Sequence, residues 1–130
     1  MAAARHITVI NDDAPFLDLM ADLLGDEGYR VTLYHGGPVV YPALKRDVPD
    51  LIVLDIRMQT PDEGWELLQV IRLDRALALV PVIVCSGDIH FLRERADHLR
   101  AKGCDTLVKP FDIAEMLGKV AVGLDASSAT

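Results

Sequence analysis

Side chains able to bind a metal ion and a phosphoryl group follow four of the five short apolar runs in this sequence. They are Asn11, Asp12 and Asp13 after the first run, Asp55 after the third, Ser86 after the fourth and Lys109 after the fifth. Carboxylate and amide oxygens suit a hard cation such as Mg²⁺, which commonly takes one or two carboxylates and keeps several waters. A hydroxyl and an ammonium group can donate hydrogen bonds to a transferring phosphoryl group, where catalysis is mostly positioning and charge neutralisation. The carboxylate left to attack phosphorus is that of Asp55.

Apolar runs rich in β-branched residues alternate along the chain with longer amphipathic segments. The runs predict strands at Ile7–Ile10, Arg30–Tyr34, Leu51–Leu54, Val82–Cys85 and Thr106–Val108. Helices are predicted from Pro15 with Asp13 as the N-cap, through Trp65, Leu68 and Ile71, over Ile89–Ala101, and through Ile113, Met116, Leu117 and Val120. The third and fourth runs are continuously apolar, which indicates strands buried on both faces. The predicted fold class is therefore doubly wound α/β with a parallel sheet.

The sequence predicts the second helix of this pattern only weakly. Pro42 lies where that helix should form. Proline lacks the amide hydrogen that a helix interior needs, and its ring clashes with the carbonyl four residues earlier. We therefore expect this helix to be short, late or distorted.

The polar residues behind the runs are expected to meet in space. In an open parallel sheet, ligands bind beyond the carboxyl ends of the strands, where the strand order reverses. Taken singly, each residue has a common structural explanation: Asp12 and Asp13 as helix caps, Asp55 and Ser86 as turn residues, and Lys109 as a helix entry. Their joint occurrence at four strand ends, in this order, favours a shared site.

The composition is that of one domain. The 130 residues are 51% hydrophobic and carry 13 basic against 20 acidic side chains, for a net charge of −7. One core is feasible at this length and a second is not. The acidic balance disfavours direct binding to nucleic acid, which requires a basic surface. There is no signal-peptide run, no stretch of about 20 apolar residues and no CxxC pair, so we expect a cytoplasmic protein that does not bind membranes.

Four segments of the chain, 7–15, 49–58, 81–87 and 107–112, together resemble the receiver domain of two-component response regulators. The resemblance covers nearly the whole chain. It implies a flavodoxin-like, doubly wound sheet of five parallel strands in the order 2-1-3-4-5 with about five helices. We expect one receiver domain over residues 1–124 and a frayed tail at 125–130.

The resemblance also implies roles for individual residues. Asp55 would accept a phosphoryl group from a histidine kinase or a phosphotransfer protein in a Mg²⁺-dependent reaction. The implied metal ligands are Asp12, Asp55 and the backbone carbonyl of Arg57, with Asn11 as a weak or water-mediated ligand. The implied phosphate-binding residues are Ser86, Gly87 and Lys109, and the Lys109–Pro110 peptide bond would be cis. The implied protein is a switch, with no enzymatic activity beyond self-phosphotransfer and autodephosphorylation.

The sequence departs from the family pattern at three places. The family usually has an acidic residue where this chain has Asn11, so Mg²⁺ is expected to bind more weakly unless Asp13 compensates. Thr106 occupies the position of the family's aromatic switch residue, so the switch pair Ser86 and Thr106 has no ring to turn inward. The loop over residues 58–64 lacks the proline that the family favours after methionine and is one residue longer before its glycine.

Arg57 and Asp88 lie two residues beyond Asp55 and Ser86, at positions that in the family tune dephosphorylation by controlling water access. One hypothesis is that their opposite charges pair across the mouth of the site, shield the phosphate and lengthen its life. The alternative is two solvated surface charges, since exposed ion pairs contribute little.

We weigh two interpretations of function. The first is a single-domain response regulator that signals through altered protein–protein binding, with an unidentified target and a possible homodimer through the last strand and helix. The second is a receiver-like interaction module that phosphorylation does not control, which Asn11 and Thr106 favour.

An aspartate-nucleophile phosphatase is disfavoured because Arg57 stands where a second aspartate is needed. A nucleotide or flavin binder is disfavoured because no glycine-rich phosphate loop follows the first strand.

Overall fold

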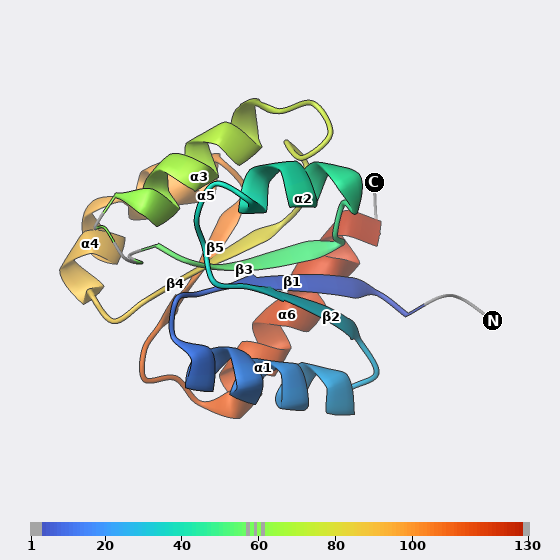
Figure 1. Cartoon of the computed structure of the whole chain (residues 1–130). Coiled ribbons are helices and arrows are strands. Elements are labelled where there is room, and N and C mark those ends of the chain that lie inside the picture. Colours follow the sequence, from blue (N-terminus) through green and yellow to red (C-terminus); the bar gives the residue numbers. More distant parts are fainter. Residues whose placement is uncertain (1–3, 57, 59, 61, 129–130) are drawn as a thin grey trace.

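The chain folds around a sheet of five parallel strands. A computed structural model describes residues 4–56, 58, 60 and 62–128 (Figure 1). The strands are β1 (His6–Ile10), β2 (Arg30–Tyr34), β3 (Leu51–Asp55), β4 (Val82–Ser86) and β5 (Cys104–Val108). Their order in the sheet is β2-β1-β3-β4-β5, which confirms the predicted topology. All residues of the three central strands are buried, which confirms the burial that the continuous apolar runs predicted for β3 and β4.

Helices cover both faces of the sheet, as Figure 1 shows. One face carries α1 (Ala14–Asp26) and α6 (Ile113–Ser128), and the other carries α2 (Val40–Arg46), α3 (Glu63–Leu73), α4 (Ile89–Glu94) and α5 (Ala96–Ala101). Each face has its own hydrophobic core, and alternate residues of one strand serve both. Ile52 and Leu54 of β3 pack on the α2–α5 side, whereas Leu51 and Val53 pack on the α1–α6 side. Within the described residues, no helix has the length and apolar character that crossing a membrane requires.

Two helix boundaries differ from the prediction. The single helix expected over Ile89–Ala101 is wrong, because the chain leaves helical geometry at Arg95, with φ −107° and ψ 8°. No Gly or Pro stands there, so the sequence carries no signal for the break. The last helix runs to Ser128, so residues 125–128 are helical where we predicted the start of a frayed tail. The structure therefore has six helices in its described part instead of about five.

The second helix is short and starts late, as Pro42 predicted. It has seven residues and begins at Val40, two residues before the proline. Pro42 therefore lies in the first turn, where backbone N–H groups have no partner within the helix and a missing one costs little.

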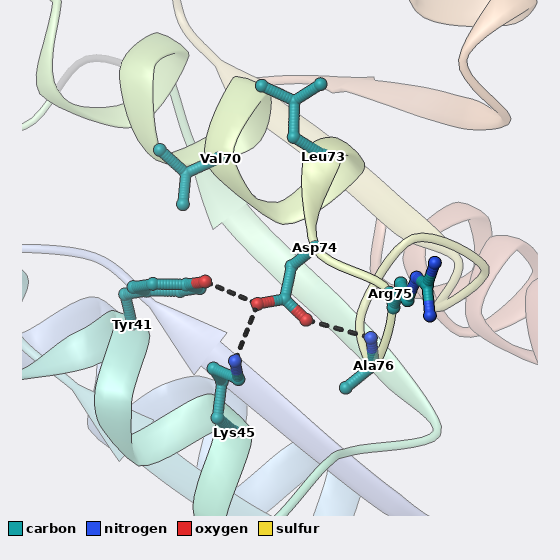
Figure 2. Close-up of a pocket in the computed structure, with 7 residues that line it drawn as sticks. All are labelled: Tyr41, Lys45, Val70, Leu73, Asp74, Arg75 and Ala76. Carbon is teal, nitrogen blue, oxygen red and sulfur yellow. Dashed lines mark hydrogen bonds and ion pairs between the residues drawn. The ribbon is translucent and has the colours of Figure 1, made fainter.

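Two side chains of α2 tie this short helix to the end of α3. Figure 2 shows Tyr41 and Lys45 converging on Asp74. The Tyr41 hydroxyl donates a hydrogen bond to the Asp74 carboxylate, the Lys45 ammonium lies 3.0 Å from it, and the backbone N–H of Ala76 donates to it at 2.8 Å. The Tyr41 hydrogen bond, followed by that of Lys45, lowers the pKa of Asp74 to about 2. The carboxylate is therefore ionised across the neutral range and holds α2 in place.

A buried histidine lies at the opposite end of the sheet from the predicted site. His6 is 4% exposed, and its Nε2 lies 2.7 Å from the Thr32 hydroxyl. Its Nδ1 has no hydrogen-bond partner among the described residues and is 3.7 Å from an Asp47 carboxylate oxygen. Burial lowers the pKa of His6, and Arg30 lowers it further, whereas Asp47 and Asp50 act in the opposite direction.

This histidine should make stability depend on pH. Below about pH 6.5 the unfolded chain protonates His6 while the folded chain resists, so unfolding is favoured and stability falls as the pH drops towards the folded pKa. We expect the urea midpoint to fall more between pH 7.5 and 5.5 for the wild type than for His6→Gln. His35→Gln, which removes an exposed histidine, serves as the control and should keep the wild-type slope. Equal slopes for all three proteins would contradict the assignment.

Candidate functional site

The sheet brings the predicted site residues to the carboxyl ends of four adjacent strands. Ile10 pairs with Leu54, so Asn11 and Asp55 are the next residues at that edge. Asp55 pairs with Cys85, and Ser86 pairs with Val108, directly before Lys109. Backbone hydrogen bonds extend this register, from Asn11 N–H to the Tyr34 carbonyl at 3.0 Å and from Lys109 N–H to the Ser86 carbonyl at 2.9 Å.

Asp55 is a buried carboxylate beside a lysine. Its side chain is 9% exposed, and the Lys109 ammonium donates a hydrogen bond to Oδ2 at 3.3 Å. Lys109 comes from β5 and crosses over the end of β4 to make this contact. The ammonium also lies 4.4 Å from the centre of the Phe16 ring, on α1. A buried carboxylate is costly unless it is paired, so Lys109 offsets the cost of burying Asp55.

Ser86 is the last residue of β4, which lies between β3 and β5 in the sheet, and it is 2% exposed. Its Oγ accepts a hydrogen bond from the backbone N–H of Asp88 at 3.0 Å. Asp88 is in turn the N-cap of α4, since its Oδ1 accepts from the Phe91 N–H at 3.0 Å. Gly87, between them, is exposed and has open space at its Cα. The hydroxyl predicted to contact phosphate is thus linked to the start of α4.

The residues after β1 divide into a buried amide and two exposed carboxylates. Asn11 is 1% exposed, and its Oδ1 accepts a hydrogen bond from the Asp13 N–H at 2.9 Å. This bond fixes the amide orientation, because the reversed amide would place two donors face to face. The Asn11 Nδ2 is then buried without a hydrogen-bond partner among the described residues. Asp12 is exposed, and Asp13 caps α1 at the Phe16 N–H, at 3.4 Å, as predicted.

The carboxylates among the predicted site residues are ligands of the kind that a hard cation such as Mg²⁺ prefers. No group of three or more His, Cys, Asp or Glu side chains in the described part of the chain is arranged to hold a metal ion. Mg²⁺ does not require such a group, because one or two carboxylates and several waters satisfy its octahedron. Asp55 and Asp12 are the carboxylates in question. The Asn11 oxygen already accepts one hydrogen bond, and its orphan N–H group suits a water or another acceptor better than a metal ion.

Some predicted features fall outside the described residues. Arg57 is one of them, so its backbone carbonyl as a metal ligand and its pairing with Asp88 stay predictions.

The Lys109–Pro110 bond is cis, as the resemblance implied. Thr106 is half-buried on β5, and its backbone carbonyl accepts a hydrogen bond from the Lys119 ammonium of α6.

Three neighbours of the site were not identified from the sequence. Phe16 lies under Lys109, although its helical spacing had marked it only as a core residue. Cys85 lies behind the site, and burial raises the pKa of its thiol to about 12, so it stays protonated. An apolar groove of about 240 Å³ opens beside Lys109. Its other lining residues are Phe16, Leu19, Leu23, Pro110, Phe111 and Ile113.

A family model described as the response regulator receiver domain matches residues 7–121. The chain belongs to this family. The regulator RpaA of Synechocystis, described as a DNA-binding dual master transcriptional regulator, is 31% identical over 115 residues, which make up 88% of this chain and 47% of RpaA. The chain spans less than half the length of the curated relatives that it matches.

Solved structures agree with the receiver fold. NtrX from Brucella abortus has a TM-score of 0.83 and 27% identity, covering 97% of this chain and 28% of NtrX. The chemotaxis response regulator CheY4 of Vibrio cholerae has a TM-score of 0.80 and 20% identity, covering 92% of this chain and 98% of CheY4. The fold thus occurs both inside longer regulators and in proteins of about this length.

In this receiver domain, Gly64 of α3 packs against the backbone at the end of β3. A Cβ atom at Gly64 would lie 2.3 Å from the Asp55 carbonyl oxygen and 2.4 Å from that of Ile56. Backbone atoms cannot move aside as flexible side chains do, so α3 would have to shift.

We therefore expect Gly64→Ala to lower the free energy of unfolding by about 1 to 3 kcal/mol, the usual cost of overpacking. Gly118→Ala is the matched control, because it lies exposed within α6 with nothing within 4 Å of its Cβ position. It should stabilise the protein by roughly 0.5 to 1 kcal/mol through helix propensity. Urea unfolding measures both, and a Gly64→Ala protein as stable as the wild type would refute the packing argument.

Proposed function

We propose that this receiver domain accepts a phosphoryl group on Asp55 from a histidine kinase or a phosphotransfer protein and signals through altered protein–protein binding. The observation that carries the proposal is the buried Asp55 carboxylate held 3.3 Å from the Lys109 ammonium, beside the buried Ser86 hydroxyl. An aspartate at a turn or helix cap needs neither burial nor this partner.

The proposed reaction transfers a phosphoryl group from a histidine nitrogen of the donor to a carboxylate oxygen of Asp55. An Asp55 carboxylate oxygen attacks phosphorus, the P–N bond of the donor phosphohistidine breaks, and the imidazole nitrogen leaves with the bonding electron pair. Lys109 and the Ser86 hydroxyl would then donate hydrogen bonds to the phosphoryl oxygens. Asp12 and Asp55, with the carbonyl of Arg57, would hold Mg²⁺, which would neutralise charge on those oxygens. The chain would act only on itself, through this transfer and through autodephosphorylation.

The surface next to the site suits a protein donor. The apolar groove beside Lys109 joins α1 to the segment before α6, and Leu19 and Ile113 on its rim are 48% and 47% exposed. Exposed apolar side chains around a reactive group are typical of a surface that another protein covers. We therefore propose that the donor approaches over this groove, so that its phosphohistidine reaches Asp55.

The proposal also covers the cellular compartment and the binding partners of the protein. Two free, buried cysteines, Cys85 and Cys104, support a reducing cytoplasm. The net charge of −7 argues against direct binding of this domain to nucleic acid. The protein target is unidentified, and a homodimer is one form that the altered binding could take.

Incubation with acetyl phosphate and Mg²⁺, followed by intact mass spectrometry, tests the proposal. We expect the mass of one added phosphoryl group, because the Asp55 oxygen can also attack acetyl phosphate with acetate as the leaving group. Asp55→Asn should abolish the mass gain. Asp97→Asn, which removes a fully exposed carboxylate, should leave it unchanged. A phosphoryl group on any other residue, or none on the wild type, would refute the assignment.

A receiver-like module that phosphorylation does not control is the second candidate. Two observations favour it: Asn11 is a buried amide in place of a charge, with an N–H group that has no partner among the described residues, and Thr106 has no aromatic ring. The acetyl phosphate experiment separates the two candidates.

The presence of Asn11 where the family usually has an acidic residue should limit Mg²⁺ affinity. A unit charge about 4 Å from a divalent cation contributes roughly 8 kcal/mol at an effective dielectric of about 20, most of which desolvation offsets. We expect Asn11→Asp to tighten Mg²⁺ binding about tenfold, equivalent to about 1.4 kcal/mol. Isothermal titration with MgCl₂ measures the change. Asp12→Asn, the matched charge removal, should weaken binding, and an Asn11→Asp affinity equal to that of the wild type would exclude this account.

A further inference from the structure

Phe16 lies beside the buried face of α1 and not on it. That face consists of Leu17, Met20 and Leu24. Phe16 is half-buried and belongs to a neighbouring stripe at helical spacing, with Leu19 and Leu23, which lines the apolar groove beside Lys109. Replacing Phe16 therefore leaves the fully buried face of α1 intact, and its ring is available for a role at the site.

The Lys109 ammonium has two attractive partners in the contacts of the described residues. The Asp55 Oδ2 accepts its hydrogen bond at 3.3 Å, and the centre of the Phe16 ring lies 4.4 Å from Nζ. An aromatic ring attracts a cation within about 6 Å of its centre through its quadrupole. The Lys109 side chain is 26% exposed, so water screens this attraction only in part. An ammonium group has three N–H donors, so the hydrogen bond to Asp55 leaves two of them for other acceptors.

Contacts on two sides fix the position of Phe16. Its backbone N–H donates a hydrogen bond at 3.4 Å to the side chain of Asp13, the N-cap of α1. Its ring meets that of Phe111 edge to face, with centroids 6.0 Å apart and an interplanar angle of 88°. Phe111 follows Lys109 by two residues. The Phe16 ring therefore contacts both the ammonium and the segment that carries it.

We infer that Phe16 is a positioning residue for phosphoryl transfer, whose ring holds the Lys109 ammonium beside Asp55 through a cation–π interaction. This inference rests on the proposed function and adds a residue to the same site. Lysine carries its charge on a flexible four-carbon stem, and ordering that stem costs conformational entropy. A ring that orders the ammonium before the phosphoryl group arrives removes this cost from the binding step. The site should therefore bind a phosphoryl mimic more tightly with the ring than without it.

Fluorination of the Phe16 ring separates this role from that of an apolar groove wall. Fluorine atoms added one after another at position 16, as mono-, di- and trifluorophenylalanine, weaken the ring quadrupole stepwise and keep the ring apolar. The probe is beryllofluoride with Mg²⁺, and the ¹⁹F NMR signal of the bound anion gives its concentration at half-saturation. We expect that concentration to rise with each fluorine, by about two- to fivefold over the series, as for a partly exposed cation–π contact. A groove wall would give a flat series.

The same titration distinguishes failure of this inference from failure of the proposed function. Asp55→Asn should give no bound signal, which ties the signal to the site. Phe16→Leu, which keeps an apolar side chain and removes the ring, should bind at least as weakly as the trifluorinated protein. A wild type without bound beryllofluoride would defeat the proposed function and the inference together. Bound beryllofluoride with equal half-saturation across the fluorinated series would defeat the inference alone.

A double-mutant cycle tests the contact itself, without a phosphoryl mimic. Phe16→Leu removes the ring, and Lys109→Met removes the charge but keeps an unbranched side chain. If the ring and the ammonium attract each other, Phe16→Leu should lower the free energy of unfolding less in Lys109→Met than in the wild type. Leu23→Ala, further along the same stripe of α1, is the control and should cost the same in both backgrounds. Equal losses from Phe16→Leu in the two backgrounds, measured by urea unfolding, would overturn the inference.

Discussion

The contact between Asp55 and Lys109 is the constraint on which the rest of the site depends. Removing a charged side chain from water costs several kcal/mol, so a carboxylate that is 9% exposed needs a partner of opposite charge. The partner comes from β5, two strands away from β3 in the sheet, with β4 between them. Ser86 ends that intervening strand. The strand order therefore places a hydroxyl between a carboxylate and an ammonium, and a different order would separate the three.

The surrounding structure keeps this pair in place from several sides. Gly64 allows α3 to approach the Asp55 carbonyl closely, and Phe16 of α1 lies against Lys109. Because α1 and α3 cover opposite faces of the sheet, the edge of the sheet is supported by both cores. The central strands are buried along their whole length because helices cover both faces of the sheet.

Local signals predicted most of this architecture, and tertiary contacts determined the rest. The continuous runs identified β3 and β4 as strands buried on both faces, and Pro42 identified the short α2, because burial and a missing N–H act within one segment. The strand order came from resemblance to receiver domains, since periodicity does not specify which strands pair. The break at Arg95 could not be predicted, because it coincides with stacking on Phe91 and Trp65 and with no Gly or Pro. The orientation of the Asn11 amide likewise depends on the Asp13 N–H, which only the folded loop places beside it.

At Asn11, the stability of the domain and the proposed binding of Mg²⁺ make opposite demands on the side chain. A carboxylate at position 11 would add negative charge to the edge of the sheet at which Lys109 pairs with Asp55. An amide avoids that added charge and forms a hydrogen bond to the Asp13 N–H that stabilises the turn into α1. The same amide would attract the proposed Mg²⁺ less than a carboxylate would, and its buried N–H group has no partner among the described residues. Position 11 thus combines a hydrogen bond that stabilises the turn into α1 with the loss of a charge that the proposed Mg²⁺ site would use.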